Sequence, residues 1–159
     1  MSAQFAITKA TATDALDVAV MVGELLVEIM NTTGILAFNF DLAETTARIE
    51  DYIDRERYFL FVARSQSGFP AGFISLTENY ALYAQGAFGT IPELYVRPEH
   101  RRNKLGFYLV SQAKSFGTSR SWTRLEVTTP PLPEFEETLA FYEREGFSIT
   151  GGRKLKISL

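Results

Sequence analysis

Basic side chains gather in a short segment between a predicted strand and a predicted helix. The segment VRPEHRRNKLGFYLV (96–110) contains Arg97, Arg101, Arg102, Lys104 and a single glycine, Gly106. The first N–H groups of a helix lack partners within the helix, and together with the helix dipole they attract anions. Glycine allows a ligand to approach the backbone closely. These residue types favour a phosphate or diphosphate site, with a solvated basic loop as the alternative.

Two common phosphate motifs and several catalytic groups are missing from the sequence. It contains no GxxxxGK[ST], and no GxGxxG follows the first predicted strand, which argues against a P-loop and a dinucleotide-binding domain. The chain has no cysteine, which excludes disulfides, thiolate metal sites and a cysteine nucleophile. Its one histidine, His100, excludes a histidine cluster, and we expect no metal site.

Size and charge restrict the class of protein further. A chain of 159 residues, 46% of them hydrophobic, is typical of one domain spanning 1–159. A net charge of −3 argues against general nucleic-acid binding, and suits a small cationic partner with one locally held anion. No apolar run approaches the roughly 20 residues of a membrane span, and no secretory signal is recognisable. We therefore expect a cytoplasmic protein.

Hydrophobic periodicity predicts the elements that position the basic segment. Helices are expected over 11–34, 41–54, 103–116 and 134–146. Strands are expected over 4–8, 58–64, 71–77, 90–96, 123–129, 147–150 and 154–159, with 78–89 as a long loop or a frayed hairpin. Gly34 should end the first helix, and Asp41 with Glu44 should cap the second. This order predicts an α+β protein, a mixed sheet with helices on both faces.

Two motifs resemble those of the GNAT-type N-acetyltransferases. LYVRPEHRRNKLGFYLV (94–110) is similar to the family's acetyl-CoA-binding segment, in which Arg/Gln-x-x-Gly-x-Gly/Ala opens a helix after a strand. LAFYEREGF (139–147) is similar to the family's ending Phe-Tyr-x-x-x-Gly-Phe. Lys104 stands at the first motif glycine, and Phe135 stands where the family often has a cofactor-contacting asparagine. We expect Lys104 to add a cation to the diphosphate, since a helix start does not strictly require a positive φ.

The resemblance implies a fold and a cofactor site. The fold is a mixed, mostly antiparallel sheet of six to seven strands flanked by four helices, splayed between strands 4 and 5, which here are 90–96 and 123–129. The cosubstrate is acetyl-CoA, whose pantetheine arm pairs with Leu94, Tyr95 and Val96. Its diphosphate is bound by the segment's backbone amides: Arg102, Asn103, Lys104, Leu105, Gly106 and Phe107, with Arg101 nearby. A homodimer is common in the family.

Acetyl transfer to a primary amine requires a base, because an alkylammonium has a pKa of about 10. Glu93, in the apolar context TIPELYV, is the candidate; the alternative is a strand-end glutamate that is exposed or paired with arginine. The departing thiolate needs a proton, for which Tyr142 is the candidate acid. Simple core packing is the alternative for Tyr142. Direct attack needs no covalent enzyme intermediate, in agreement with the lack of cysteine.

The acceptor and the reaction class leave alternatives. Phe38, Phe40, Tyr80 and Tyr83 lie in two predicted loops, and either line the acceptor site or cover the edge of the core. The expected activity is N-acetylation of a small-molecule amine. A non-catalytic acyl-CoA-binding module, and an acetyltransferase for protein N-termini or lysines, are the alternatives.

Overall fold

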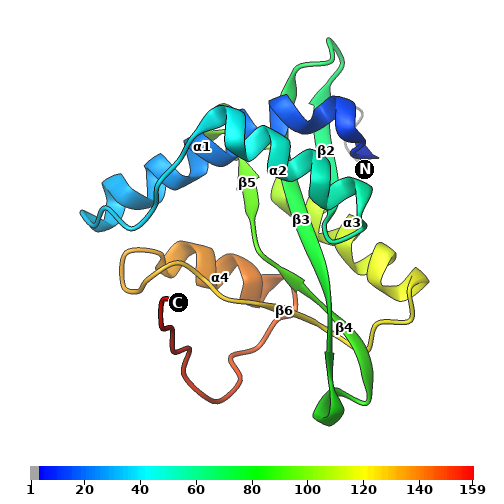
Figure 1. Cartoon of the computed structure of the whole chain (residues 1–159), viewed down its shortest axis with the longest axis vertical. Helices are drawn as coiled ribbons and strands as arrows, with labels where there is room; N and C mark the ends of the chain where they lie inside the picture. Colours follow the sequence, from blue (N-terminus) through cyan, green and yellow to red (C-terminus); the bar gives the residue numbers. More distant parts are fainter. Residues whose placement is uncertain (1–3) are drawn as a thin grey trace.

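The computed structural model describes residues 4–159 (Figure 1). The helices are α1 (Ala15–Thr33), α2 (Leu42–Asp54), α3 (Leu105–Ser119) and α4 (Glu136–Arg144). The strands are β1 (Phe5–Lys9), β2 (Phe59–Ser65), β3 (Pro70–Ala81), β4 (Gly86–Ile91), β5 (Leu94–Val96) and β6 (Leu125–Val127). One-turn 3₁₀ helices cover Ala12–Asp14, Leu82–Ala84 and Pro98–His100.

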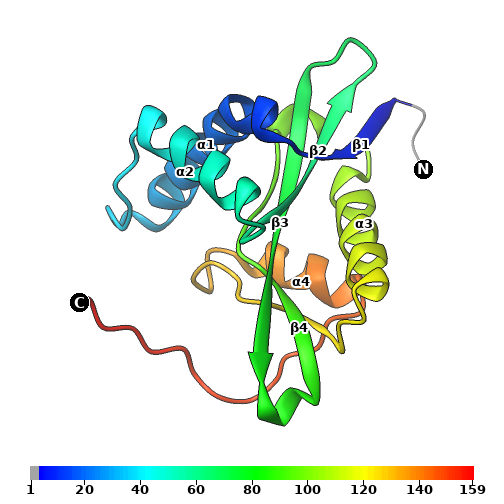
Figure 2. The same ribbon diagram turned by 45° about the vertical axis from the view of Figure 1, so that its right-hand side comes forward.

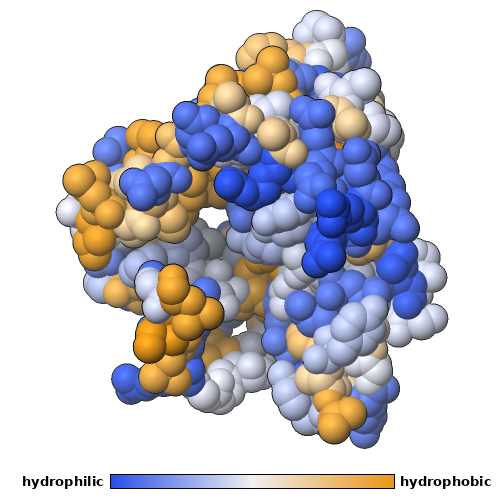
Figure 3. Space-filling view, viewed as in Figure 1, coloured by the Kyte–Doolittle hydropathy of each residue, from blue (hydrophilic) through white to orange (hydrophobic). Residues whose placement is uncertain are grey.

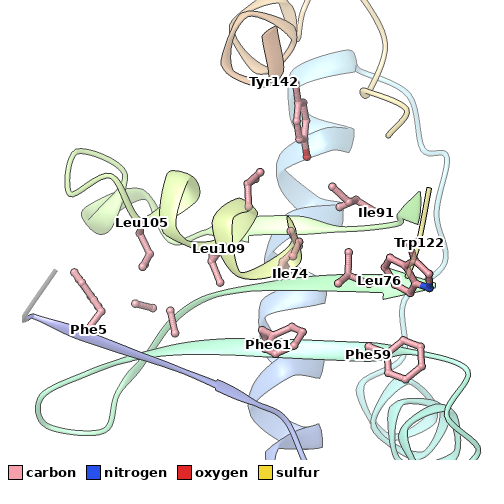
Figure 4. Close-up of a cluster of buried hydrophobic side chains, with 14 residues drawn as sticks. Phe5, Phe59, Phe61, Ile74, Leu76, Ile91, Leu105, Leu109, Trp122 and Tyr142 are labelled. Atoms are coloured by element: carbon pink, nitrogen blue, oxygen red, sulfur yellow. The ribbon is translucent and has the colours of Figure 1, made fainter. Parts of the chain in front are cut away.

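The strands form one sheet, with the order β1-β2-β3-β4-β6 and with β5 paired to β3. All pairs are antiparallel except β4 with β6. Helices α1 and α2 cover one face and α3 the other (Figure 2). The sheet has a hydrophobic core on each face, and successive residues of β3 point into opposite cores. Phe73 packs in the core under α1, whereas Ile74 and Leu76 pack in the core under α3 (Figure 4). The mixed, mostly antiparallel sheet with four helices confirms the predicted fold class.

The predicted helix boundaries have local causes. Gly34 follows α1 with a left-handed φ of 72°, which glycine adopts without steric cost. The Asp41 carboxylate accepts a hydrogen bond of 2.8 Å from the Glu44 N–H and caps α2. α1 begins later than predicted, at Ala15, because Ala12–Asp14 form a 3₁₀ turn in which the Thr11 N–H donates to Asp14.

The predicted strand over 90–96 is divided into β4 and β5 by an irregularity at Pro92 and Glu93. Thr90 lies opposite Thr77, and Leu94 lies opposite Ile74, so four steps along this strand match three along β3. One extra residue against a continuous partner is a β-bulge, which bends a strand and redirects its side chains. Before the bulge β4 pairs with both β3 and β6, whereas β5, beyond the bulge, pairs within residues 4–159 only with β3. The expected splay against the strand at 123–129 is therefore present.

Three predicted segments differ in the structure. Residues 78–89 form an ordered hairpin, because β3 continues to Ala81 and β4 begins at Gly86. The predicted strands over 147–150 and 154–159 are wrong, since neither segment pairs with a strand within residues 4–159, and apart from the half-buried Phe147 both are exposed. Alternating apolar residues form a strand only where an edge and a covering surface meet them. In residues 4–159 no partner of this kind reaches the segment.

Candidate active site

A cleft opens where β5 and β6 diverge. Its cavity is about 660 Å³ and is lined by α1, β5, the segment after β5, and α4. Figure 3 shows the opening between the surfaces of α1 and α4. A cavity of this size matches the volume of small-molecule and cofactor sites.

One edge of β5 is free and faces this cleft. The Ser75 N–H donates to the Glu93 carbonyl, and the Arg97 N–H donates to the Ala71 carbonyl, each at 2.9 Å. Because peptide groups alternate along a strand, those of Leu94 and Val96 point away from β3. The Arg101 guanidinium donates 2.8 Å to the Val96 carbonyl. The other peptide groups on this edge are positioned to pair with an extended ligand.

The basic turn, residues 97–104, leads from β5 to α3. Of the predicted cofactor residues, the cleft is lined by Leu94, Tyr95, Val96, Arg101, Arg102, Lys104, Gly106 and Phe107. Asn103 and Leu105 do not line it, and Leu105 is buried in the core. Arg101 forms an ion pair of 2.6 Å with Glu28 of α1. The Glu28 carboxylate therefore partly neutralises the charge of Arg101. The sequence did not predict this ion pair.

The backbone at Lys104 corrects an expectation from the sequence. Lys104 has a φ of 58°, in the left-handed region, so the statement that this position needs no positive φ is wrong here. The turn has to reverse the chain direction before α3 begins, and a left-handed residue does so. A glycine adopts this conformation without steric cost, whereas lysine is strained there.

Gly106 lies where two helices pack closely. A Cβ atom at this position would lie 3.2 Å from two ring carbons of Phe141 on α4. That distance is tighter than ordinary van der Waals contact, so glycine lets the start of α3 approach α4. The same small residue leaves the α3 N-terminus accessible from the cleft.

Glu93 is a half-buried carboxylate held by two hydroxyl groups. The Ser75 hydroxyl donates to Oε1 at 2.5 Å, and the Tyr58 hydroxyl lies 3.5 Å from Oε2. The Ser75 oxygen also accepts the Glu93 N–H at 2.9 Å, and Ser75 is itself fully buried. Burial raises the pKa of Glu93, and the two hydroxyl groups oppose that rise by stabilising the carboxylate.

Tyr142 lies on the other face of the sheet from Glu93. Its side chain is 5% exposed and points from α4 toward the strands that carry Ile74 and Ile91 (Figure 4). Its ring contacts Phe141 and Phe147, and burial raises its pKa. Within residues 4–159 its hydroxyl has no hydrogen-bond partner, and it lines the cleft. Both candidate catalytic residues thus reach the same cavity, Glu93 from the bulge before β5 and Tyr142 from α4.

The predicted acceptor aromatics lie outside the cleft lining. Phe40 packs over α1, where its ring would be 2.8 Å from a Cβ at Gly23, and Phe38 is partly exposed beside it. Tyr80 is 75% exposed on the β3–β4 hairpin and donates to Glu78, and Tyr83 lies at the hairpin tip.

Three residues of α1 line the cleft instead: Leu25, Glu28 and Ile29. Leu25 and Ile29 fall at helical spacing, as core residues also do, so no sequence signal distinguishes cavity lining from core here.

The architecture is shared with acetyltransferases of known structure. The GCN5-related N-acetyltransferase from Ralstonia eutropha JMP134 aligns with a TM-score of 0.74 at 19% identity, over 96% of this chain and 98% of that one. The ribosomal-protein-alanine N-acetyltransferase from Brucella melitensis biovar Abortus 2308 gives 0.73 at 18%, over 97% and 99%. An aminoglycoside acetyltransferase from an uncultured soil metagenomic sample gives 0.76 at 14%, over 98% and 96%. Comparison with curated proteins gives no match.

The sequence itself identifies the family. Residues 26–147 match the model of the acetyltransferase (GNAT) family, and this range contains the cleft residues of β5, the basic turn and α4, with Glu28 and Ile29 of α1. The chain therefore belongs to the GNAT acetyltransferase family. No helix in residues 4–159 combines the length and the apolar character needed to cross a bilayer.

Proposed function

We propose that residues 1–159 form a single N-acetyltransferase domain that acetylates a primary amine of a small molecule from acetyl-CoA. The observation that carries this proposal is the cleft itself, in which a free strand edge, an α3 N-terminus and a half-buried carboxylate face one cavity. When bound, acetyl-CoA supplies the activated acetyl group and a thiolate leaving group.

The residues present fit this cosubstrate. The peptide groups of Leu94 and the N–H of Val96 offer strand-like pairing to the pantetheine arm, whereas the Val96 carbonyl already accepts from Arg101. The N–H groups of residue 102 and residues 104–107, with the charges of Arg102 and Lys104, offer an anion site for the diphosphate. The predicted contact from Asn103 is less suited to it, because its N–H donates to the His100 carbonyl at 3.3 Å. Gly106 lines the cleft at the α3 N-terminus.

Glu93 is proposed to receive the proton of the amine. An ammonium group must lose a proton before its lone pair can attack, and a carboxylate with a raised pKa is the better base at neutral pH. Ser75 and Tyr58 hold both carboxylate oxygens on the α1 side of the sheet, so the acceptor would enter from that side. Glu28 and the apolar side chains of α1 line that part of the cleft.

Tyr142 is proposed to donate a proton to the departing thiolate. Its hydroxyl reaches the cleft from α4, on the opposite face from Glu93, so the base and the acid act at different ends of the breaking bond. The raised pKa keeps the hydroxyl protonated at neutral pH, as a proton donor requires.

Release of free thiol from acetyl-CoA in the presence of a panel of amines tests the proposal. We expect release with at least one small primary amine, and a loss of about 100-fold in turnover for Glu93→Gln, the range of a general base. Glu99→Gln is the matched control, since Glu99 is exposed on the basic turn and does not line the cleft. Acetyl-CoA binding without thiol release for any amine would establish a binding module instead.

A further inference from the structure

Helix α1 is apolar on two faces, and within residues 4–159 only one of them is buried. The inner face packs into the core beside β2, β3 and β5, where Val18 and Met21 are almost fully buried. The outer face carries Leu16, Val20 and Val27, which are 54%, 37% and 49% exposed. A surface helix normally has one apolar stripe and a polar opposite face. The second stripe therefore indicates a surface that another molecule covers.

The apolar residues of the outer face form a continuous line. At about 100° per residue their side chains lie within about 40° of one another, and the line extends over about 16 Å, or about three turns. Phe40 of the loop after α1 crosses this line at Gly23, where an added Cβ atom would lie 2.8 Å from its ring. The Phe40 ring is itself 37% exposed. We call Leu16, Val20, Val27 and Phe40 the outer stripe. Further apolar side chains cover the end of α1 and the loop that follows it (Figure 3).

The charged side chains of α1 are already paired. From residue 15 to residue 30 the helix has three polar residues, and each forms an ion pair with an arginine of another element. The pairs join Asp17 to Arg64, Glu24 to Arg97, and Glu28 to Arg101. Side chains that could keep this helix in water are thus committed to β2 and the basic turn.

Uncompensated charge lies instead on the loop after α1 and on α2. Residues 34–57 contain six acidic and three basic side chains, all of them exposed, so their net charge is −3. The whole chain also has a net charge of −3, so the remaining residues sum to zero. Because α2 packs along α1, the outer stripe lies beside the segment that carries the entire net charge of the protein.

We propose that the outer stripe is the docking surface for a basic amphipathic helix of another protein. Such a helix would place its apolar side chains on the outer stripe and its lysines and arginines toward the acidic side chains of α2. An apolar line of about three turns suits a helix, because residues three and four apart share one face and the ridges of one helix pack into the grooves of another. The inference does not depend on acetyl transfer.

Charge distinguishes this partner from two others. In a symmetric pair of this chain the same patch would meet itself, so a net charge of −3 would face another of −3, and like charges across an interface cost affinity. An anionic membrane would be repelled in the same way. A cationic helix matches both the apolar stripe and the charge beside it.

The first test measures the binding of a labelled synthetic peptide to the full chain by fluorescence anisotropy. The peptide has about 18 residues, enough to form a helix, with leucine along one face and lysine on the other. It should bind at least about tenfold more tightly than a peptide with glutamate in place of lysine, or one of the same composition with the leucine stripe scrambled. Salt should weaken the binding, because part of the affinity is electrostatic.

Two double variants locate the docking site. Val20→Ser with Val27→Ser should weaken binding of the lysine peptide at least about tenfold, because two apolar contacts are lost. This variant should keep its Tm, since serine and valine have similar helix propensities and both side chains are partly exposed. Leu82→Ser with Leu155→Ser is the matched control, because it removes two exposed leucines from the β3–β4 hairpin and the C-terminal segment. Its affinity should stay within about twofold of wild type.

Amide hydrogen exchange in residues 16–27 should slow when the lysine peptide binds to the wild type. Absence of saturable binding by the lysine peptide, equal binding of the glutamate peptide, or undiminished binding by the double valine variant overturns the proposal. A dimer in sedimentation, or binding to vesicles of zwitterionic phosphatidylcholine, also overturns it if the double valine variant loses that association, because the outer stripe then has a different occupant.

Discussion

Lys104 combines a strained backbone with a useful charge, and two substitutions separate these effects. A left-handed conformation costs a residue with a Cβ roughly 1–2 kcal/mol, and Lys104 has a φ of 58°. Glycine removes that cost but gains conformational freedom in the unfolded chain, which offsets about 0.4–1 kcal/mol. Lys104→Gly should therefore exceed Lys104→Ala in free energy of unfolding by about 1 kcal/mol, or about 2–4 °C in Tm.

Both variants lose the ammonium group equally, so their affinities for acetyl-CoA should fall together. The loss should be about fivefold, equivalent to about 1 kcal/mol for a partly exposed charge pair, and it should shrink at high salt. Thermal unfolding measures the first effect and calorimetry at two ionic strengths the second. Equal stability of the two variants would refute the strain argument. Wild-type affinity in both would show that Lys104 does not contact the diphosphate.

Three other substitutions test the polar groups. Ser75→Ala should raise the pKa of Glu93 further, because a hydrogen bond to the carboxylate is lost, and should move the acid limb of the kcat/KM profile to higher pH. An unmoved limb would mean that Glu93 is not the titrating base. Tyr142→Phe should lower kcat by about 10- to 100-fold with little change in Tm; full turnover would assign Tyr142 to packing. Hydrogen bonds led by that from Trp122 lower the pKa of Glu78 to about 2, so wild type should lose stability as the pH falls from about 4.5 toward 2. Glu78→Gln should melt lower at neutral pH and lack that loss, and an equally steep acid loss in the variant would contradict the assignment.

The fold was largely predictable because its elements carry strong local signals. The α1 and α2 patterns, Gly34 and the Asp41 cap all act within a few residues of the chain. The division of 90–96 was not predictable, since Thr90, Ile91 and Leu94 read as one continuous strand. The bulge depends on two neighbours, β3 and β6, that lie elsewhere in the sequence.

The site was predictable where it is local and not where it is assembled. The basic turn and Glu93 are visible as residue types in one segment. The partners of Glu93 are not, because Tyr58 and Ser75 are 35 and 18 positions away and read as ordinary strand residues. The same holds for Glu28, which reaches Arg101 across 73 positions. The strands over 147–150 and 154–159 were mispredicted for the opposite reason, since their local pattern is clear but no strand of residues 4–159 pairs with them.

The extra residue at the β4–β5 bulge gives this region an unusual sensitivity to changes in length. Most substitutions near Pro92 would change stability or activity gradually, since one side chain replaces another on an unchanged backbone. Loss of a single residue between Ile91 and Leu94 would instead rotate everything beyond it by half a turn, sending Tyr95 toward α3 and Leu94 toward α1. Homologues that retain the cleft should therefore tolerate variation in residue type here while keeping the number of residues constant.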